Sequence, residues 1–232
     1  TIGGKAGEAL TPLDIVKYTS SFGYWLKLTT GKNKVVIGRD ARISGAMVSQ
    51  LVAATLQALG MDVVDLGLST TPTVELAVPE EAAAGGIILT ASHNPIQWNA
   101  LKLLNDKGEF ISAKDGEQVL QSAADESYVF AEVKQLGAYT YKEGYIEKHI
   151  EKILALPLVD VAAIKARGFK IAVDAVNSTG GLALPPLLKA LGVAHVGDFY
   201  CEPTGHFPHN PEPLPENLAQ FAKEVSRSGY DL

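Results

Sequence analysis

The sequence has little that would place the chain in a membrane or in an oxidising compartment. It holds a single cysteine, Cys201, which cannot form an internal disulfide, so we expect a cytoplasmic protein in which this thiol is structural. No segment approaches the roughly 18 uninterrupted apolar residues that a membrane-spanning helix needs. The chain opens at Thr1 without an apolar signal core or an initiator methionine, and we therefore expect a trimmed or partial chain.

Positive charge is scarce as well. The chain has 20 Lys and Arg residues against 26 Asp and Glu residues, which gives a formal net charge of -6. This balance, with no basic run among aromatic residues, argues against a nucleic-acid partner. A sugar phosphate remains a possible ligand, because its binding depends on a local group of cations and backbone N–H groups. We expect no membrane partner, and the sequence leaves the oligomeric state open.

Apolar residues, in contrast, make up 47% of the 232 residues, enough for one large core or two modest ones. Short apolar runs alternate with segments of helical spacing. This order predicts an α/β fold with mixed, largely parallel sheets flanked by helices. The expected strands are 34–38, 61–67, 86–90, 169–174 and 194–199, with a hairpin over 101–111. The expected helices are 11–28, 44–59, 71–78, 113–124, 143–155, 159–166, 179–191 and 216–228.

The alternation is interrupted after residue 127. A polar, aromatic stretch there precedes a charged amphipathic segment that ends at Pro157. We predict a first domain at 1–140, a linker helix at 141–158 and a second domain at 159–232. The second domain is expected to be incomplete, because no strand follows its last helix.

Ser92 is the main candidate for a functional residue. It follows the apolar strand 86–90 directly, at the carboxyl end where open parallel sheets place ligand crevices. A serine hydroxyl needs a neighbouring base or metal ion to act as a nucleophile. The residues alone also allow an ordinary turn in which the serine bonds to local backbone. Polar side chains that follow within eleven positions are His93, Asn94, Asn99 and Lys102.

Two familiar chemistries lack their motifs. A Ser-His-Asp hydrolase is excluded, because no Gly-x-Ser-x-Gly surrounds Ser92 and the adjoining His93 is poorly placed to be its base. A dinucleotide-binding domain is disfavoured, because no Gly-x-Gly-x-x-Gly follows the first strand.

The run Thr90 to Pro95, which reads Thr-Ala-Ser-His-Asn-Pro and is followed by Asn99 and Lys102, resembles the phosphoserine loop of the α-D-phosphohexomutases. These include phosphoglucomutases, phosphomannomutases and phosphoglucosamine mutases. Other segments resemble, in order, the family's Gly-Arg-Asp-x-Arg-x-Ser and Gly-x-x-x-Thr-Pro motifs, the opening of its second domain and the stretch before its metal-binding loop: 36–45, 66–73, 173–181 and 205–213. The chain is thus identified as the N-terminal part of a member of this superfamily.

The resemblance implies an interconversion of hexose 6-phosphate and hexose 1-phosphate. A phosphoserine at Ser92 would donate its phosphoryl group, and the resulting hexose 1,6-bisphosphate would reorient and return the other one. The implied cofactors are Mg²⁺ and this bisphosphate, with a Ser92 phosphate oxygen and three aspartates as metal ligands. The aspartate loop is not in the sequence and is expected beyond Leu232, so we predict that the fragment alone is inactive. The alternatives are a phosphoglucosamine mutase and a non-catalytic sugar-phosphate-binding module.

The same resemblance suggests roles for neighbouring residues. Lys102 matches the general acid/base at the sugar hydroxyl, and its alternative is a solvated hairpin lysine. His93 would bond near the phosphate or the reacting hydroxyl, or else stabilise the loop. Asn94 would orient the loop.

Three further residues are expected to support the loop. Arg39 and Asp40 would form an ion pair beside the crevice, and a purely structural salt bridge is the alternative. Asn99 opens the segment Asn-Ala-Leu-Lys, where the family often has Asn-Gly-x-Lys, so a side chain at Ala100 replaces a flexible position.

Overall fold

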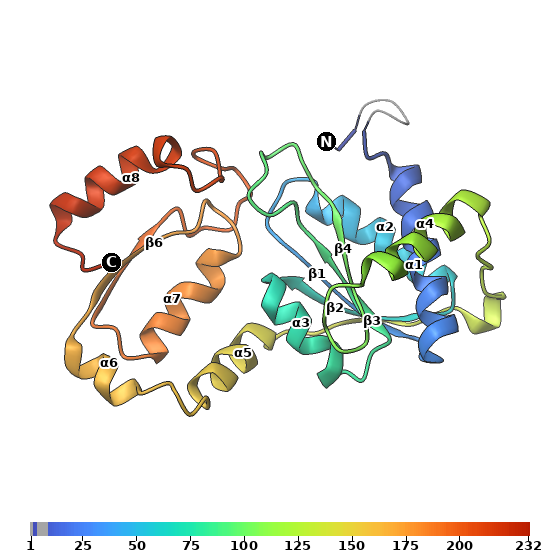
Figure 1. The fold of residues 1–232 in the computed structure, drawn as a ribbon, viewed down its shortest axis with the longest axis horizontal. Coiled ribbons are helices and arrows are strands. Elements are labelled where there is room, and N and C mark those ends of the chain that lie inside the picture. Colours follow the sequence, from blue (N-terminus) through green and yellow to red (C-terminus); the bar gives the residue numbers. More distant parts are fainter. Residues whose placement is uncertain (1, 4–8) are drawn as a thin grey trace. The chain divides into compact units, whose positions relative to one another are not determined.

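The computed structural model describes residues 2–3 and 9–232. They divide into two compact units, which we treat separately. Unit 1 comprises Thr1–Arg39, Ser44–Thr90 and Gln97–Glu143. Unit 2 comprises Gly144–Leu232 together with two short segments, Asp40–Ile43 and Ala91–Ile96. Figure 1 traces the chain through both units.

Unit 1 is built on one five-stranded sheet with the strand order β4-β3-β1-β2-β5. Parallel pairing joins β1 to β3, β1 to β2 and β2 to β5, whereas β4 runs antiparallel to β3 at one edge. The mixed, largely parallel sheet predicted from the sequence is confirmed. Its strands are β1 (Lys34–Arg39), β2 (Asp62–Leu68), β3 (Gly85–Leu89), β4 (Leu101–Leu104) and β5 (Tyr139–Tyr141).

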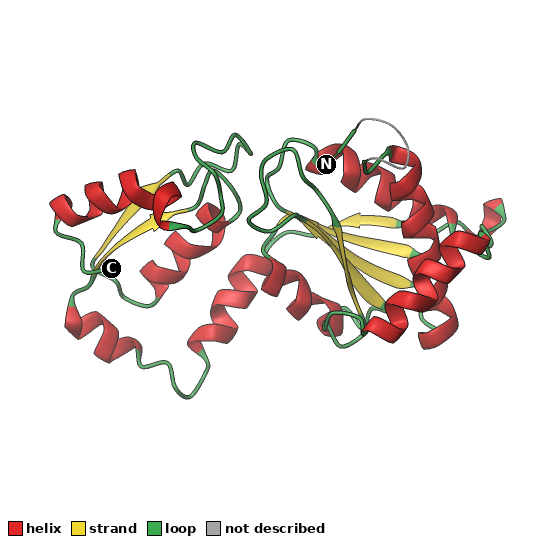
Figure 2. Cartoon of the chain, turned by 45° about the horizontal axis from the view of Figure 1, so that its top comes forward, coloured by secondary structure: helices red, strands yellow, loops and turns green. Residues whose placement is uncertain are grey.

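Helices cover both faces of this sheet, as Figure 2 shows. Val35 and Ile37 of β1 pack into the main core cluster with the buried faces of α1 and α2. On the other face, the α-carbon of Gly38 lies against Val74 of α3. Central parallel strands are continuously apolar for this reason. The helices are α1 (Pro12–Thr30), α2 (Gly45–Ala58), α3 (Thr71–Glu80) and α4 (Ala113–Asp125), with a short 3₁₀ turn η1 (Val133–Gln135).

The start of α1 shows how local sequence sets an element. Thr11 accepts a hydrogen bond from the backbone N–H of Asp14, and the Asp14 carboxylate accepts one from the Thr11 backbone N–H at 2.8 Å. Pro12 occupies the first helical position, where a missing N–H costs nothing. At the other end, Gly31 takes a left-handed conformation that closes the helix. The predicted start at Thr11 is confirmed.

Two edge features differ from the expectations. The second strand of the predicted hairpin is reduced to a single bridge between Leu104 and Phe110, because the Asn105 side chain accepts hydrogen bonds from the backbone of Lys107 and Glu109 and tightens the turn. The strand β5 was not predicted at all. Its three residues are exposed, so no buried periodicity marked it.

A buried carboxylate explains how β5 attaches to the sheet. Asp65 of β2 is 7% exposed and accepts hydrogen bonds from the Tyr139 hydroxyl, at 2.9 Å, and from the backbone N–H of Gly67, at 2.7 Å. The β5 backbone pairs with β2 beside these bonds. The attachment is therefore a long-range polar contact, which spacing along the chain does not reveal.

Unit 2 contains a smaller parallel sheet of β6 (Lys170–Asp174) and β7 (His195–Phe199). The helix α7 (Gly180–Ala190) packs on both strands and also on α5 (Tyr145–Leu154). The other helices are α6 (Val161–Arg167) and α8 (Pro215–Ser228). We predicted a linker at 141–158, but the division falls between Glu143 and Gly144, and α5 packs within unit 2. Within the described part of the chain, no helix has the length and apolar character needed to cross a membrane.

Candidate functional site: the serine loop and its supports

Ser92 lies in a tight turn just after β3. Its side chain is exposed, and its backbone adopts φ +55°, a left-handed conformation that is unfavourable for a residue other than glycine. Asn94 closes the turn: its backbone N–H and its side-chain amide both donate to the carbonyl of Ala91, at 3.0 and 2.9 Å. Such strain persists only where the surroundings hold it in place.

His93 is the side chain next to the serine hydroxyl. Its Nδ1 lies 3.4 Å from Ser92 Oγ, at the long end of the hydrogen-bond range, and both side chains are exposed. The contact leaves the imidazole accessible to solvent and to a ligand. An imidazole so placed can donate to a phosphate oxygen or exchange a proton near the hydroxyl.

Arg42 lies behind the loop. It is 1% exposed, and its guanidinium donates to three carbonyl oxygens of the serine turn: Nη1 to Pro95 at 2.7 Å, and Nη2 to Ser92 and to Asn94 at 2.8 Å each. Its Nε donates to Asp40 Oδ2 at 3.0 Å, while Asp40 Oδ1 accepts from the Arg42 backbone N–H at 3.0 Å. One buried side chain thus binds the whole turn.

Asp40 forms an ion pair with Arg42, a residue that we had not predicted to take part. The expected pairing of Arg39 with Asp40 stays a prediction. Arg39 ends β1 and belongs to unit 1. We did not predict a role for Arg42. The Asp-x-Arg spacing could have indicated it, because an aspartate side chain often accepts a hydrogen bond from the backbone N–H two positions later.

The backbone beside Arg42 is held by other parts of unit 2. The Ala41 N–H donates to Ser178 Oγ at 3.3 Å. Gly205, at φ +74°, packs so closely on the Ala41 carbonyl that a side-chain carbon there would overlap it. The ring of Phe207 covers the guanidinium, with its centroid 5.1 Å from the central carbon.

A second charged contact, between Asp174 and His209, anchors the segment that contains Phe207. His209 Nε2 lies 2.8 Å from Asp174 Oδ2, and Nδ1 lies 2.8 Å from the Asn210 carbonyl oxygen. Both neighbours are acceptors, so both contacts are hydrogen bonds only when the imidazole carries two protons. Burial alone would lower the pKa of His209, but the hydrogen bonds to Asn210 and Asp174 and the charge of Asp174 outweigh it, and the pKa is raised.

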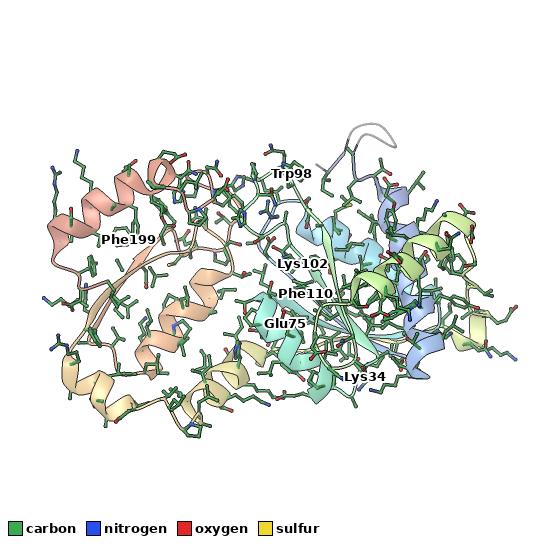
Figure 3. The ribbon with its side chains drawn as sticks, viewed as in Figure 1. Lys34, Glu75, Trp98, Lys102, Phe110 and Phe199 are labelled. Carbon is green, nitrogen blue, oxygen red and sulfur yellow. The ribbon has the colours of Figure 1, made fainter. Side chains whose placement is uncertain are left out.

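Lys102 and Asn99 belong to unit 1, whereas Ser92, His93 and Asn94 belong to unit 2. Lys102 lies on β4 opposite Ile88, and its ammonium is 5.9 Å from the Phe110 ring (Figure 3).

Asn99 is buried at the entry to β4. Its amide donates to Ser44 Oγ at 3.0 Å, and its side-chain oxygen accepts from the Ala100 N–H at 2.9 Å. Asn99 therefore links the segment just before β4 to the start of α2.

A metal ion would need more ligands than the loop offers. Over residues 2–3 and 9–232, no three His, Cys, Asp or Glu side chains gather closely enough to bind one. Asp40, the carboxylate nearest Ser92 in the network described above, is engaged by Arg42. The described residues therefore offer no group of three such side chains to hold a metal ion beside Ser92.

The fold and the loop define an α/β protein with an exposed serine at the carboxyl end of a sheet strand. Residues 2–129 match the family model for phosphoglucomutase/phosphomannomutase, alpha/beta/alpha domain I, and residues 144–232 match that for domain II. The chain belongs to the phosphoglucomutase/phosphomannomutase family.

Individual relatives agree with this assignment. The chain is 38% identical, over 99% of its length, to a phosphoglucomutase/phosphomannomutase of Thermococcus kodakarensis, and 32% identical over its full length to a probable phosphoglucosamine mutase of Methanopyrus kandleri. A crystal structure of a family protein from Burkholderia thailandensis superposes with a TM-score of 0.81 at 27% identity, covering 98% of this chain and 49% of that one. The chain spans about half the length of the curated relatives it matches.

Proposed function

We propose that Ser92 is the phosphate carrier of a mutase that interconverts hexose 6-phosphate and hexose 1-phosphate. The observation that carries this proposal is the serine turn itself. Its hydroxyl is exposed at the end of β3, while the carbonyls of the turn are bound from behind by a buried arginine. A strand-end loop of this kind suits phosphoryl transfer, which depends on positioning more than on covalent chemistry.

The proposed reaction conserves phosphate in two transfers. In the first, a hydroxyl oxygen of the hexose phosphate attacks the phosphorus of phosphoserine 92 and gives its proton to a base, while the bond from phosphorus to Ser92 Oγ breaks and Oγ takes up a proton. In the second, Ser92 Oγ loses its proton and attacks the other phosphate of the bisphosphate, and the departing sugar oxygen takes up a proton. We assign the proton transfers to Lys102, with His93 bonding to the phosphate or the reacting hydroxyl.

The cofactor proposals depend on more than the described residues. Mg²⁺ would neutralise charge on the transferring oxygens, and the Ser92 phosphate would be one of its ligands. The described residues supply no carboxylate cluster for it, so no step above passes through the metal. Hexose 1,6-bisphosphate is proposed as the intermediate that also phosphorylates Ser92. The cytoplasmic location stays a prediction.

The sugar is left between glucose, mannose and glucosamine phosphates. Relatives named phosphoglucomutase/phosphomannomutase and probable phosphoglucosamine mutase match the chain at 38% and 32% identity. Assays of the three sugar 1-phosphates and 6-phosphates, with the protein expressed from its complete gene, distinguish these substrates.

Intact-mass measurement before and after phosphatase treatment tests the role of Ser92. The wild-type protein, expressed from its complete gene, is expected to carry or accept one phosphoryl group, and Ser92→Ala is expected to carry none and to lose mutase activity. Ser226→Ala is the matched control, because Ser226 is an exposed serine on α8 that bonds only within its helix turn.

Either of two results would count against the mutase. A wild-type protein that never takes phosphate at Ser92 contradicts the mechanism. Saturable binding of a hexose phosphate with neither phosphorylation nor turnover would indicate the non-catalytic binding module instead.

A further inference from the structure

Arg42 is almost fully buried, which is unusual for a charged side chain. A guanidinium removed from water loses several kcal/mol of hydration, which only close pairing recovers. At least four of its five N–H groups are used, one on the Asp40 carboxylate and three on carbonyls of the serine turn. A lysine could not reproduce this planar set of bonds.

The bonds also explain the shape of the turn. The carbonyls of Ser92, Asn94 and Pro95 converge on one group, which keeps them on the Arg42 side of the loop. The Ser92 side chain, in contrast, is exposed. The left-handed backbone of Ser92 is strained, so it requires support of this kind.

Arg42 is itself held in place from three sides. Asp40 binds it through both carboxylate oxygens, Ser178 fixes the preceding N–H, and Gly205 packs on the preceding carbonyl. The Phe207 ring lies over the guanidinium, in the geometry of a cation–π contact. The 205–209 segment therefore contacts the same arginine that binds the serine turn.

We propose that Arg42 is a positioning residue that sets where the Ser92 hydroxyl and its phosphate lie, with Phe207 as its cover. Arg42 contacts the loop from behind, so it acts through Ser92 and not on the sugar. This inference rests on the proposed function. A merely structural arginine would affect stability, whereas a positioning arginine affects the rate of phosphoryl transfer more than substrate binding.

The first test replaces the planar guanidinium of Arg42 by the ammonium group of a lysine. In the protein expressed from its complete gene, Arg42→Lys is expected to lower kcat roughly 10- to 100-fold while KM changes by less than about 3-fold, because small misplacements of reacting groups cost rate. Hydrogen exchange supplies a readout that is independent of activity. The Asn94 amide, bonded to Ala91, is expected to exchange faster in the variant.

A second pair of variants guards against loss of folding, because Arg42→Lys leaves Asp40 less well paired. Phe207→Leu removes the aromatic cover and is expected to lower kcat roughly 3- to 10-fold and to speed Asn94 exchange, since the cation–π contact that holds the guanidinium is lost. Phe199→Leu is the matched control, because Phe199 packs on Phe221 and Tyr230 in the same unit. It is expected to leave kcat and Asn94 exchange unchanged.

The outcomes separate the two proposals. A wild-type protein that never carries phosphate on Ser92 overturns the proposed function. A phosphorylated, active wild type with a folded Arg42→Lys variant of equal kcat overturns the positioning role alone. Equal losses of kcat in Phe207→Leu and Phe199→Leu would also overturn it, because the effect would then reflect general loosening of unit 2.

Discussion

Unit 1 and unit 2 differ in the contacts that stabilise each of them internally. In unit 1 the central strands β1 and β3 are apolar and buried on both faces, and α1 and α2 contribute fully buried side chains such as Phe22 and Leu56. In unit 2 the strands are half-exposed, and α6 and α8 bury no residue. Ring contacts of Phe199 with Phe221 and Tyr230 and the Asp174–His209 pair add to its packing.

This difference bears on where the site is made. In the chain, Ser92 follows β3 of unit 1. Its turn belongs to unit 2, where Arg42 of the same unit binds it. We therefore expect substitutions in the two units to lower the free energy of unfolding to different extents.

The largest expected effect comes from a cavity in unit 1. Leu56→Ala empties a fully buried site and is expected to cost about 3–5 kcal/mol, whereas Leu184→Ala on α7, where the leucine is 43% exposed, should cost under about 1.5 kcal/mol. Urea unfolding followed by tryptophan fluorescence measures the first effect, because Trp25 and Trp98 both lie in unit 1. Equal losses at the two leucines would contradict the contrast between the units.

A smaller effect is expected at the tight contact in unit 2. Gly205→Ala adds a carbon that overlaps the Ala41 carbonyl at a positive φ, and we expect a loss of about 2–4 kcal/mol. Gly168→Ala is the matched control, with a similar φ of +67° and open space, and should cost only about 1–2 kcal/mol. Urea unfolding followed by far-UV circular dichroism compares them. Equal costs would mean that the Ala41 contact contributes nothing.

The smallest effect is a pH dependence. Because the pKa of His209 is raised, its stabilising contribution is present below the unfolded value of about 6.5 and is lost as pH rises through the folded value. The loss of Tm in His209→Gln should thus be larger near about pH 6 than near about pH 9.

His149 provides the opposite control. Burial lowers its pKa, so its contribution is present above the unfolded value and is lost as pH falls. The loss of Tm in His149→Gln should accordingly shrink toward low pH. A His209→Gln effect that did not vary with pH would show that the contact with Asp174 does not depend on the imidazole charge.

Features that depend on near neighbours in the chain could be predicted from the sequence. The start of α1 follows from Thr11, Pro12 and Asp14, and the alternation of apolar runs predicts the parallel strands. Ser92 was singled out as a candidate because it directly follows a predicted strand. These signals are local, and they survive without knowledge of what packs on them.

The contacts between residues far apart in the chain could be seen only in the folded protein. It showed that β5 joins the sheet through Asp65, that α5 packs on α7, and that Arg42 binds the carbonyls of the serine turn. Each of these contacts joins groups whose separation along the chain carries no periodic signal. A buried polar group takes whichever partner the fold brings to it, because leaving it unpaired costs more than any local preference supplies.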